Sequence, residues 1–215
     1  YFSLRKFGRY ALCCNILKDQ LDNVTFHSEI IMLRHAEVLD KKSIYGRSNI
    51  GIKKFDNDKK NRFQKYFSKI ENIYTSPAKR CLQTFEEIWP ATKLPKKDKR
   101  LWEQDFGDWE GKLFSELPDL GILDNEDLAN FLPPNGESFK NVCDRVKPAI
   151  IEISKIALNA PVLVICHAGT IRATIALALE NYSVPLKFEI NNLSLTRIRV
   201  LSDTQYSIIS TNELV

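Results

Sequence analysis

The chain has 215 residues, of which 44% are hydrophobic and 27% are charged, and its formal net charge is +4. These values fit one globular domain that buries an apolar core. No apolar run approaches the roughly 20 residues of a membrane-spanning helix, and the basic residues are scattered among acidic ones. The composition therefore argues against a membrane protein and against a nucleic-acid binder, whereas a mild positive charge suits an anionic small molecule.

Residues 1–28 carry basic side chains ahead of a short apolar run, YALCCNIL, and no A-x-A-like cleavage site follows. We expect an N-terminal extension, to which the sequence assigns no role. The chain has an odd number of cysteines, with no CxxC pair and mostly apolar neighbours. This pattern predicts buried free thiols in a reducing cytoplasm, and hence a cytoplasmic protein. The cysteines are Cys13, Cys14, Cys81, Cys143 and Cys166.

Two short apolar runs end in a histidine. EIIMLRH ends at His35, directly after Arg34, and VLVICH ends at His167. Neither run alternates between apolar and polar residues, which is typical of parallel strands covered on both faces. Because ligands bind beyond the carboxyl ends of such strands, we expect both histidines at the ligand-binding edge.

Helices are predicted between and after these strands. PAKRCLQTFEEIW (77–89) places a proline in a first helical turn, and apolar residues recur at steps of three or four over 139–157. Pro148 should kink that helix or mark its restart. A helix over 169–180 and a C-terminal hairpin of 194–201 with 205–210 follow. Alternating strands and helices predict an α/β sandwich with a largely parallel sheet and a helical layer on each side.

Three further features surround the predicted edge. Arg80 lies one turn into the helix after YTSP, and arginine binds phosphate oxygens through paired hydrogen bonds. The small residues of HAGT and the free N–H groups of the next helix favour an anion. LWEQDFGDWEG places Glu103 and three other acidic residues near two tryptophans. A carboxyl group desolvated by aromatic walls suits a general acid.

Each feature alone has a plainer explanation. A histidine at a strand end is more often a hydrogen-bonded structural residue, Arg80 could be half of a surface ion pair, and the acidic run could be a solvated turn. Together they indicate phosphoryl transfer through histidine. A neutral imidazole is the nucleophile, fixed positive charge stabilises the phosphoryl oxygens, and an acid protonates the leaving group. This chemistry requires no metal and no cofactor.

Five blocks occur in the order that is seen in the histidine phosphatase superfamily, the phosphoglycerate mutase-like group. They are LRHAE, YTSPAKRCLQT, LWEQDFGDWEG, PPNGESF and VICHAGTIRA. The sequence resembles that family from residue 30 to the C-terminus. The resemblance implies a three-layer α/β/α sandwich with a mainly parallel central sheet, and residues 29–215 as the histidine phosphatase domain.

The resemblance also implies residue roles. His35 would be phosphorylated, Glu103 would donate the proton, and Glu110 would support the loop structurally. The catalytic set is therefore His35, Glu103 and His167. The residues implied to line the phosphate pocket are Arg34, Arg80 and His167.

The sequence departs from the family pattern after the nucleophile. Ala36 stands where glycine is usual, and would be strained if the backbone there had a positive φ. The loop that follows lacks the family's asparagine, so other residues are expected to contact phosphate or substrate, with Arg47 as our choice. The remaining candidates are Lys41, Ser43, Asn49, Ala168 and Gly169.

Within the superfamily, IYGRSN, DFGDWEG, PPNGESF and KFEINNLSLTRI are most similar to α-ribazole phosphatase, which implies removal of phosphate from α-ribazole 5′-phosphate in cobalamin assembly. The short segment 112–139 predicts an open site and favours a phosphatase over a phosphoglycerate mutase. A phosphoprotein or phosphohistidine phosphatase would use the same blocks, and a non-catalytic phosphate-binding protein is the least favoured hypothesis. The expected partner is a small phosphorylated metabolite, with no nucleic acid and no membrane. The sequence leaves a homodimer open.

Overall fold

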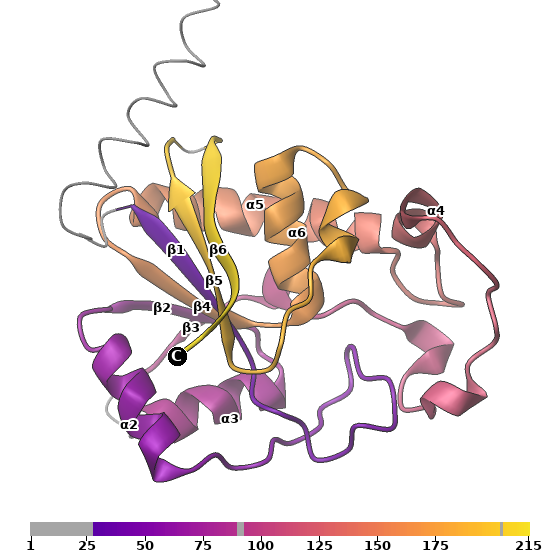
Figure 1. The fold of residues 1–215 in the computed structure, drawn as a ribbon, viewed down its shortest axis with the longest axis horizontal. Helices are drawn as coiled ribbons and strands as arrows, with labels where there is room; N and C mark the ends of the chain where they lie inside the picture. Colours follow the sequence, from indigo (N-terminus) through magenta and orange to yellow (C-terminus); the bar gives the residue numbers. More distant parts are fainter. Residues whose placement is uncertain (1–27, 90–92, 203) are drawn as a thin grey trace, which may run out of the picture.

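The computed structural model describes residues 28–89, 93–202 and 204–215, so the extension expected over residues 1–28 lies outside the described residues apart from Ser28. A six-stranded sheet forms the centre of the protein, in the order β3-β2-β4-β1-β5-β6 (Figure 1). The first four strands in this order are parallel, β5 runs antiparallel to β1, and β6 runs antiparallel to β5. The strands are β1 (Glu29–Arg34), β2 (Asn72–Thr75), β3 (Lys96–Lys97), β4 (Val162–Cys166), β5 (Ser194–Val200) and β6 (Tyr206–Leu214).

Helices cover both faces of this sheet. The helices α2 (Asn57–Tyr66) and α3 (Lys79–Ile88) lie on one face, and α5 (Phe139–Ala157) and α6 (Ala168–Leu179) lie on the other (Figure 1). The central strand β1 is buried on both sides, because alternate residues point to opposite faces. Its even-numbered apolar residues pack in the core with α5 and α6, and its odd-numbered ones in the core with α2 and α3. The predicted α/β/α sandwich is confirmed.

Local sequence signals explain where the longest helix begins. The Ser138 hydroxyl accepts a hydrogen bond from Asn141 N, and the Asn141 side chain accepts one from Ser138 N, which is a capping box. The helix α5 then runs to Ala157 with Pro148 inside it, so of the two alternatives at Pro148, a kink or a restart, the restart is not observed. The helix α3 also differs from expectation. Pro77 lies one residue ahead of the N-cap Ala78 and not in the first turn.

Several elements were not anticipated from the sequence. The helix α2 is mostly polar and buries one residue, Phe63, so its apolar periodicity is weak. The strand β3 has only two exposed residues, too few to give a strand pattern in the sequence. The other short elements are α4 (Asn125–Asn130), η2 (Lys99–Leu101), η3 (Gly107–Trp109), η4 (Phe114–Glu116) and η5 (Val184–Lys187).

Three of the five cysteines are buried inside the fold. Cys81, Cys143 and Cys166 are buried free thiols, and burial raises the pKa of the Cys81 and Cys143 thiols to about 12. Cys13 and Cys14 lie outside the described residues. Within the described ranges, no helix is both long and apolar enough to cross a membrane.

Candidate active site

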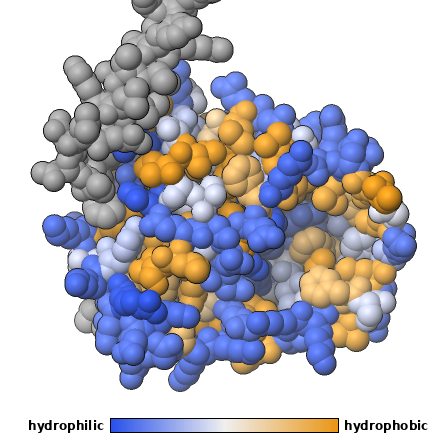
Figure 2. Space-filling model, in the orientation of Figure 1, coloured by the Kyte–Doolittle hydropathy of each residue, from blue (hydrophilic) through white to orange (hydrophobic). Residues whose placement is uncertain are grey.

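The two strand-end histidines converge beyond the carboxyl end of the sheet. His35 and His167 directly follow the adjacent parallel strands β1 and β4, in which Arg34 pairs with Cys166. The centroids of the two imidazole rings lie 5.2 Å apart, and the His35 amide donates a hydrogen bond to the Cys166 carbonyl. Figure 2 shows a hollow in this face of the molecule, to the right of centre. The two histidines lie together at the carboxyl edge of the sheet.

Hydrogen bonding fixes the tautomer and the orientation of His35. Its Nδ1 donates to the carbonyl of Ala36 at 2.7 Å, which assigns the ring proton to Nδ1 and leaves the lone pair on Nε2. Burial, followed by the charge of Arg80, holds the pKa of His35 well below its ordinary value. The Asn192 amide donates to the His35 carbonyl at 2.9 Å and fixes the main chain. His35 is therefore a neutral, oriented imidazole at pH 7.

Arg80 and His167 form one hydrogen-bonded unit. Arg80 is the second residue of α3 and is 1% exposed. Its Nε donates to Nδ1 of His167 at 3.1 Å, and Nε2 of His167 lies 2.8 Å from the Ser76 hydroxyl. Because an arginine N–H can only donate, His167 carries its proton on Nε2. Burial, followed by the charges of Arg80 and His35, holds the pKa of His167 well below its usual range.

Arg34 contributes a second buried guanidinium. Its Nη1 donates to the Ile190 carbonyl, whereas its buried Nε has no hydrogen-bond partner among the described residues. Burial lowers the pKa of Arg34, and the Glu103 carboxylate opposes that effect. An unsatisfied buried donor on a cation costs free energy unless an anion binds it. Arg34 is therefore suited to hold a phosphoryl oxygen.

The Glu103 side chain lies against the N-terminus of α6 and interacts electrostatically with Arg34. Its Oε2 accepts a hydrogen bond from the Gly169 amide at 3.2 Å, and its Oε1 accepts one from the Gln104 amide. A Cβ atom at residue 169 would lie 2.1 Å from Oε1, so the close approach requires glycine there. The helix N-terminus that we expected to favour phosphate thus holds this carboxylate, which the helix dipole also favours.

Arg145, on α5, secures the segment that carries Glu103. Its guanidinium donates to the carbonyls of Trp102 and Glu103 at 3.1 and 3.2 Å, and it pairs with the Glu137 carboxylate at 2.9 Å. The Trp102 ring in turn stacks on the His167 ring, with 5° between the planes. The general-acid candidate is therefore held by the helical layer and is not on a free loop.

Sequence reasoning missed four polar residues of this site. They are Ser76, Arg145, Arg172 and Asn192. Arg172 has a visible signal, since it is a charged residue inside the apolar helix AGTIRATIALAL. Burial lowers the pKa of Arg172, and the Glu103 and Glu189 carboxylates raise it. The other three act through contacts that only the folded chain creates.

The residues expected to contact the substrate differ in their hydrogen-bond partners and in their exposure. The Arg47 guanidinium lies 5.6 Å from the Trp102 ring centroid and pairs with Glu137 at 3.2 Å. The Ser43 hydroxyl donates to Asp40, and the Asn49 side chain accepts from the Lys79 amide. Lys41 is exposed, and Ala168 and Gly169 begin α6. Their contacts with a substrate stay predictions.

Ala36 does not show the strain that we considered. It is absent from the described residues with positive φ. Its amide donates to the Thr84 hydroxyl at 2.8 Å, and its side chain is buried. A methyl group is thus accommodated next to the nucleophile.

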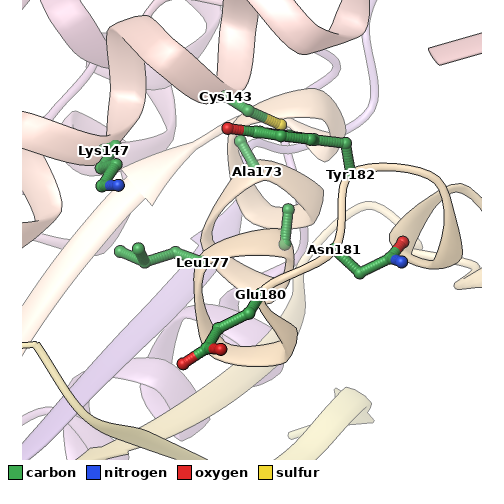
Figure 3. Close-up of a pocket in the computed structure, with 8 residues that line it drawn as sticks. Cys143, Lys147, Ala173, Leu177, Glu180, Asn181 and Tyr182 are labelled. Atoms are coloured by element: carbon green, nitrogen blue, oxygen red, sulfur yellow. The ribbon is translucent and has the colours of Figure 1, made fainter.

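A cavity lies away from this edge, between α5 and α6. It has a volume of about 240 Å³, and Figure 3 shows Cys143 and Lys147 reaching it from α5 and Leu177 from α6. None of the histidines or arginines of the candidate site lines it. Across the part of the chain that the structure describes, no group of three or more His, Cys, Asp or Glu side chains could hold a metal ion.

Comparison with known proteins shows the family of the chain. Residues 30–213 match the model of the histidine phosphatase superfamily (branch 1). A bifunctional protein of Mycobacterium tuberculosis is 30% identical over 163 residues, which cover 71% of this chain and 44% of that protein. The chain therefore spans less than half the length of that relative.

Solved structures share the fold. A mycobacterial glucosyl-3-phosphoglycerate phosphatase superposes with a TM-score of 0.73 at 21% identity, covering 87% of this chain and 100% of that one. A putative alpha-ribazole-5'-P phosphatase from Escherichia coli superposes with a TM-score of 0.73 at 18% identity, covering 88% and 98%. At these identities the likeness shows the fold alone.

Proposed function

Because the chain belongs to the histidine phosphatase superfamily (branch 1), we propose that it hydrolyses phosphate monoesters of small metabolites through a phosphohistidine intermediate. The observation that carries this proposal is the state of His35. Its imidazole is buried and neutral, its Nε2 lone pair is free, and two guanidinium groups act on it electrostatically. This arrangement supports His35 as the nucleophile, with Arg34 and Arg80 as the groups that bind phosphate.

In the first step, Nε2 of His35 attacks the phosphorus atom and the bond from phosphorus to the ester oxygen breaks. Arg34 and Arg80 stabilise the charge on the three remaining oxygens. Glu103 acts as the general acid and gives a proton to the departing alkoxide, and such a transfer contributes about 10² to 10⁴-fold in rate. The products are an alcohol and phosphorylated His35.

In the second step, the Glu103 carboxylate takes a proton from a water molecule, whose oxygen attacks the phosphorus. The bond between phosphorus and Nε2 breaks and inorganic phosphate leaves. His35 recovers its neutral tautomer because Nδ1 keeps its proton and stays hydrogen-bonded to the Ala36 carbonyl throughout. Glu103 is again protonated, so no external acid or oxidant is consumed.

We propose α-ribazole 5′-phosphate as the first natural substrate to test, with cobalamin assembly as the process served. Support comes from the IYGRSN, DFGDWEG, PPNGESF and KFEINNLSLTRI blocks of the sequence. Three buried free thiols support a reducing, cytoplasmic location. We further propose that residues 29–215 form the histidine phosphatase domain, since the family match starts at residue 30.

The test is phosphate release by the purified protein and by its His35→Ala variant, without added metal. Four substrates are compared: p-nitrophenyl phosphate, α-ribazole 5′-phosphate, 3-phosphoglycerate and a phosphohistidine peptide. A preference for α-ribazole 5′-phosphate that the variant loses supports the proposal. Interconversion of 3-phosphoglycerate and 2-phosphoglycerate would identify a mutase, preference for the peptide a phosphoprotein phosphatase, and phosphate binding without turnover a binding protein.

A further inference from the structure

Glu110 is the most heavily hydrogen-bonded carboxylate near the site, although it contacts none of the catalytic candidates. Its oxygens accept hydrogen bonds from the amides of Gly46, Arg47 and Ser48 at 2.7 to 3.1 Å. They also accept from the Ser48 hydroxyl at 2.6 Å and from the Phe106 amide at 3.2 Å. One side chain therefore gathers three successive amides of residues 46–48.

The ionisation of Glu110 suits this arrangement. Burial alone would raise the pKa of Glu110, but the hydrogen bonds from Ser48, Arg47 and Phe106 outweigh it and hold the pKa below its ordinary value. The group is thus a carboxylate at neutral pH, with acceptor positions only. Every donor around it is satisfied by that charged form.

Carbonyls of the same segment face the other way, toward Arg80. Nη2 of Arg80 donates to the Gly46 carbonyl at 2.7 Å, and Nη1 donates to the Ser48 carbonyl at 2.9 Å. Each terminal nitrogen of an arginine has two N–H groups. One N–H on each is therefore committed to the loop, and the second stays available for a phosphoryl oxygen.

Packing keeps residues 46–48 in place. A Cβ atom on Gly46 would lie 1.8 Å from the Gln104 carbonyl oxygen and 2.6 Å from Oε1 of Glu110. The loop is thus pressed against the segment that follows Glu103. Packing thus fixes where the segment lies, and the hydrogen bonds to Glu110 fix how its peptide groups are turned.

From these contacts we infer that Glu110 is a positioning residue, which sets the orientation of the Arg80 guanidinium through the backbone of residues 46–48. This inference rests on the proposed function. Glu110 itself touches neither the substrate nor the reacting atoms. Loss of its charge should turn the loop carbonyls and misdirect the Arg80 fork, because an amide offers a donor where amides already point.

The test is a double-mutant cycle of Glu110→Gln and Arg80→Lys, measured as kcat/KM for p-nitrophenyl phosphate. Glu110→Gln alone should lower kcat/KM by about 10- to 100-fold, the size expected for hydrogen bonds to a charged group. In the Arg80→Lys background, where no fork is left to orient, the same change should cost less than about 3-fold. Equal fold losses in the two backgrounds would overturn the inference.

A matched control separates positioning from general folding. Glu116→Gln removes another carboxylate that accepts a backbone amide, that of Leu113, in the exposed turn η4. It should leave kcat/KM within about 2-fold. If Glu110→Gln does not fold, the cycle is run with Ser48→Ala, which deletes a single hydroxyl donor to Glu110. Additive effects in that cycle would equally overturn the inference.

The binding constant for inorganic phosphate, measured by calorimetry on the same variants, distinguishes failure of this inference from failure of the proposed function. If the wild-type protein binds phosphate but hydrolyses no monoester, the proposed function fails. A non-additive cycle in the phosphate binding constants would then still support the role of Glu110. If the wild-type protein does not bind phosphate at all, both fall.

Discussion

Nε of Arg80 donates a hydrogen bond to Nδ1 of His167 across 3.1 Å. This contact joins the first turn of α3 to the end of β4, and it selects the tautomer of a fully buried histidine. The positive charge of Arg80 also disfavours protonation of the neighbouring imidazole. In the proposed mechanism, the positive charge that binds phosphate therefore resides on the arginines, and the imidazoles stay neutral.

His35→Ala should abolish turnover, because no other group supplies the Nε2 lone pair at this position. The variant should also lose any acid-labile phosphorylation seen after rapid quenching of the wild-type protein with labelled substrate. Calorimetric phosphate binding should persist in the variant, since Arg34 and Arg80 remain. Residual turnover above about one part in a thousand would contradict the assignment of His35 as nucleophile.

Glu103→Gln should slow hydrolysis of alkyl phosphates more than that of p-nitrophenyl phosphate. An alkoxide needs a proton in order to leave, whereas p-nitrophenolate leaves with little help. We expect a loss of about 10² to 10³-fold on the alkyl ester and about 10-fold on the aryl ester. Equal losses on both substrates, measured as kcat, would remove Glu103 from the role of general acid.

Gly169→Ala should separate activity from stability. The added methyl group would displace the Glu103 carboxylate from the Gly169 amide, because the approach is only 2.1 Å. We expect kcat to fall by about 10-fold or more on alkyl phosphates. Stability should hold or rise by up to about 1 kcal/mol, because alanine is the better helix former. Thermal unfolding and steady-state kinetics on one preparation decide the matter, and an unchanged kcat would contradict the tight placement of the carboxyl group.

EDTA should leave activity unchanged, because the positive charge for the transition state comes from the guanidinium groups of Arg34 and Arg80. The protein is dialysed against the chelator and assayed with and without added magnesium or zinc. Arg34→Met, in contrast, should weaken calorimetric binding of inorganic phosphate by about 10- to 100-fold. If EDTA inhibits the protein and an added metal restores its activity, the mechanism without metal is refuted.

Stability should fall as the pH is lowered from 7 to 5. The pKa values of His35 and His167 are depressed in the folded protein, so below about 6.5 the unfolded chain binds protons that the folded chain does not. Their contribution is thus present above pH 6.5 and lost below it, with a slope of up to about 1.4 kcal/mol per pH unit for each histidine.

Urea unfolding at several pH values tests this dependence. His35→Asn should remove about half of the slope between pH 6.5 and 5.5, because one of the two buried imidazoles is gone. Carboxylates with a lowered pKa, such as Glu110, lose their contribution only below about pH 4.3, outside that window. A slope that is the same in the variant and in the wild-type protein would show that other groups control the acid response.

Local pattern was enough to predict the centre of the fold and the convergence of the two histidines. Buried parallel strands have a recognisable composition, and strand direction alone brings their carboxyl ends to one edge. The helix α2 was missed because it presents a single buried residue. Two sets of hydrogen bonds could not be predicted: those from Arg145 to the segment that carries Glu103, and those that link Glu110 to Arg80 through residues 46–48. They depend on side chains meeting backbone groups more than 30 residues away, and sequence spacing does not encode such distances.

The segment before the C-terminal hairpin closes around the nucleophile. The Ile190 carbonyl accepts from Arg34, the Asn192 amide holds the His35 carbonyl, and the Leu193 amide donates to the Arg34 carbonyl. On the ribosome, β1 is therefore made before residues 190–200 and gains these partners only when they emerge from the exit tunnel. A nascent chain arrested before that point would carry His35, Glu103 and His167 and still lack the framework that orients His35.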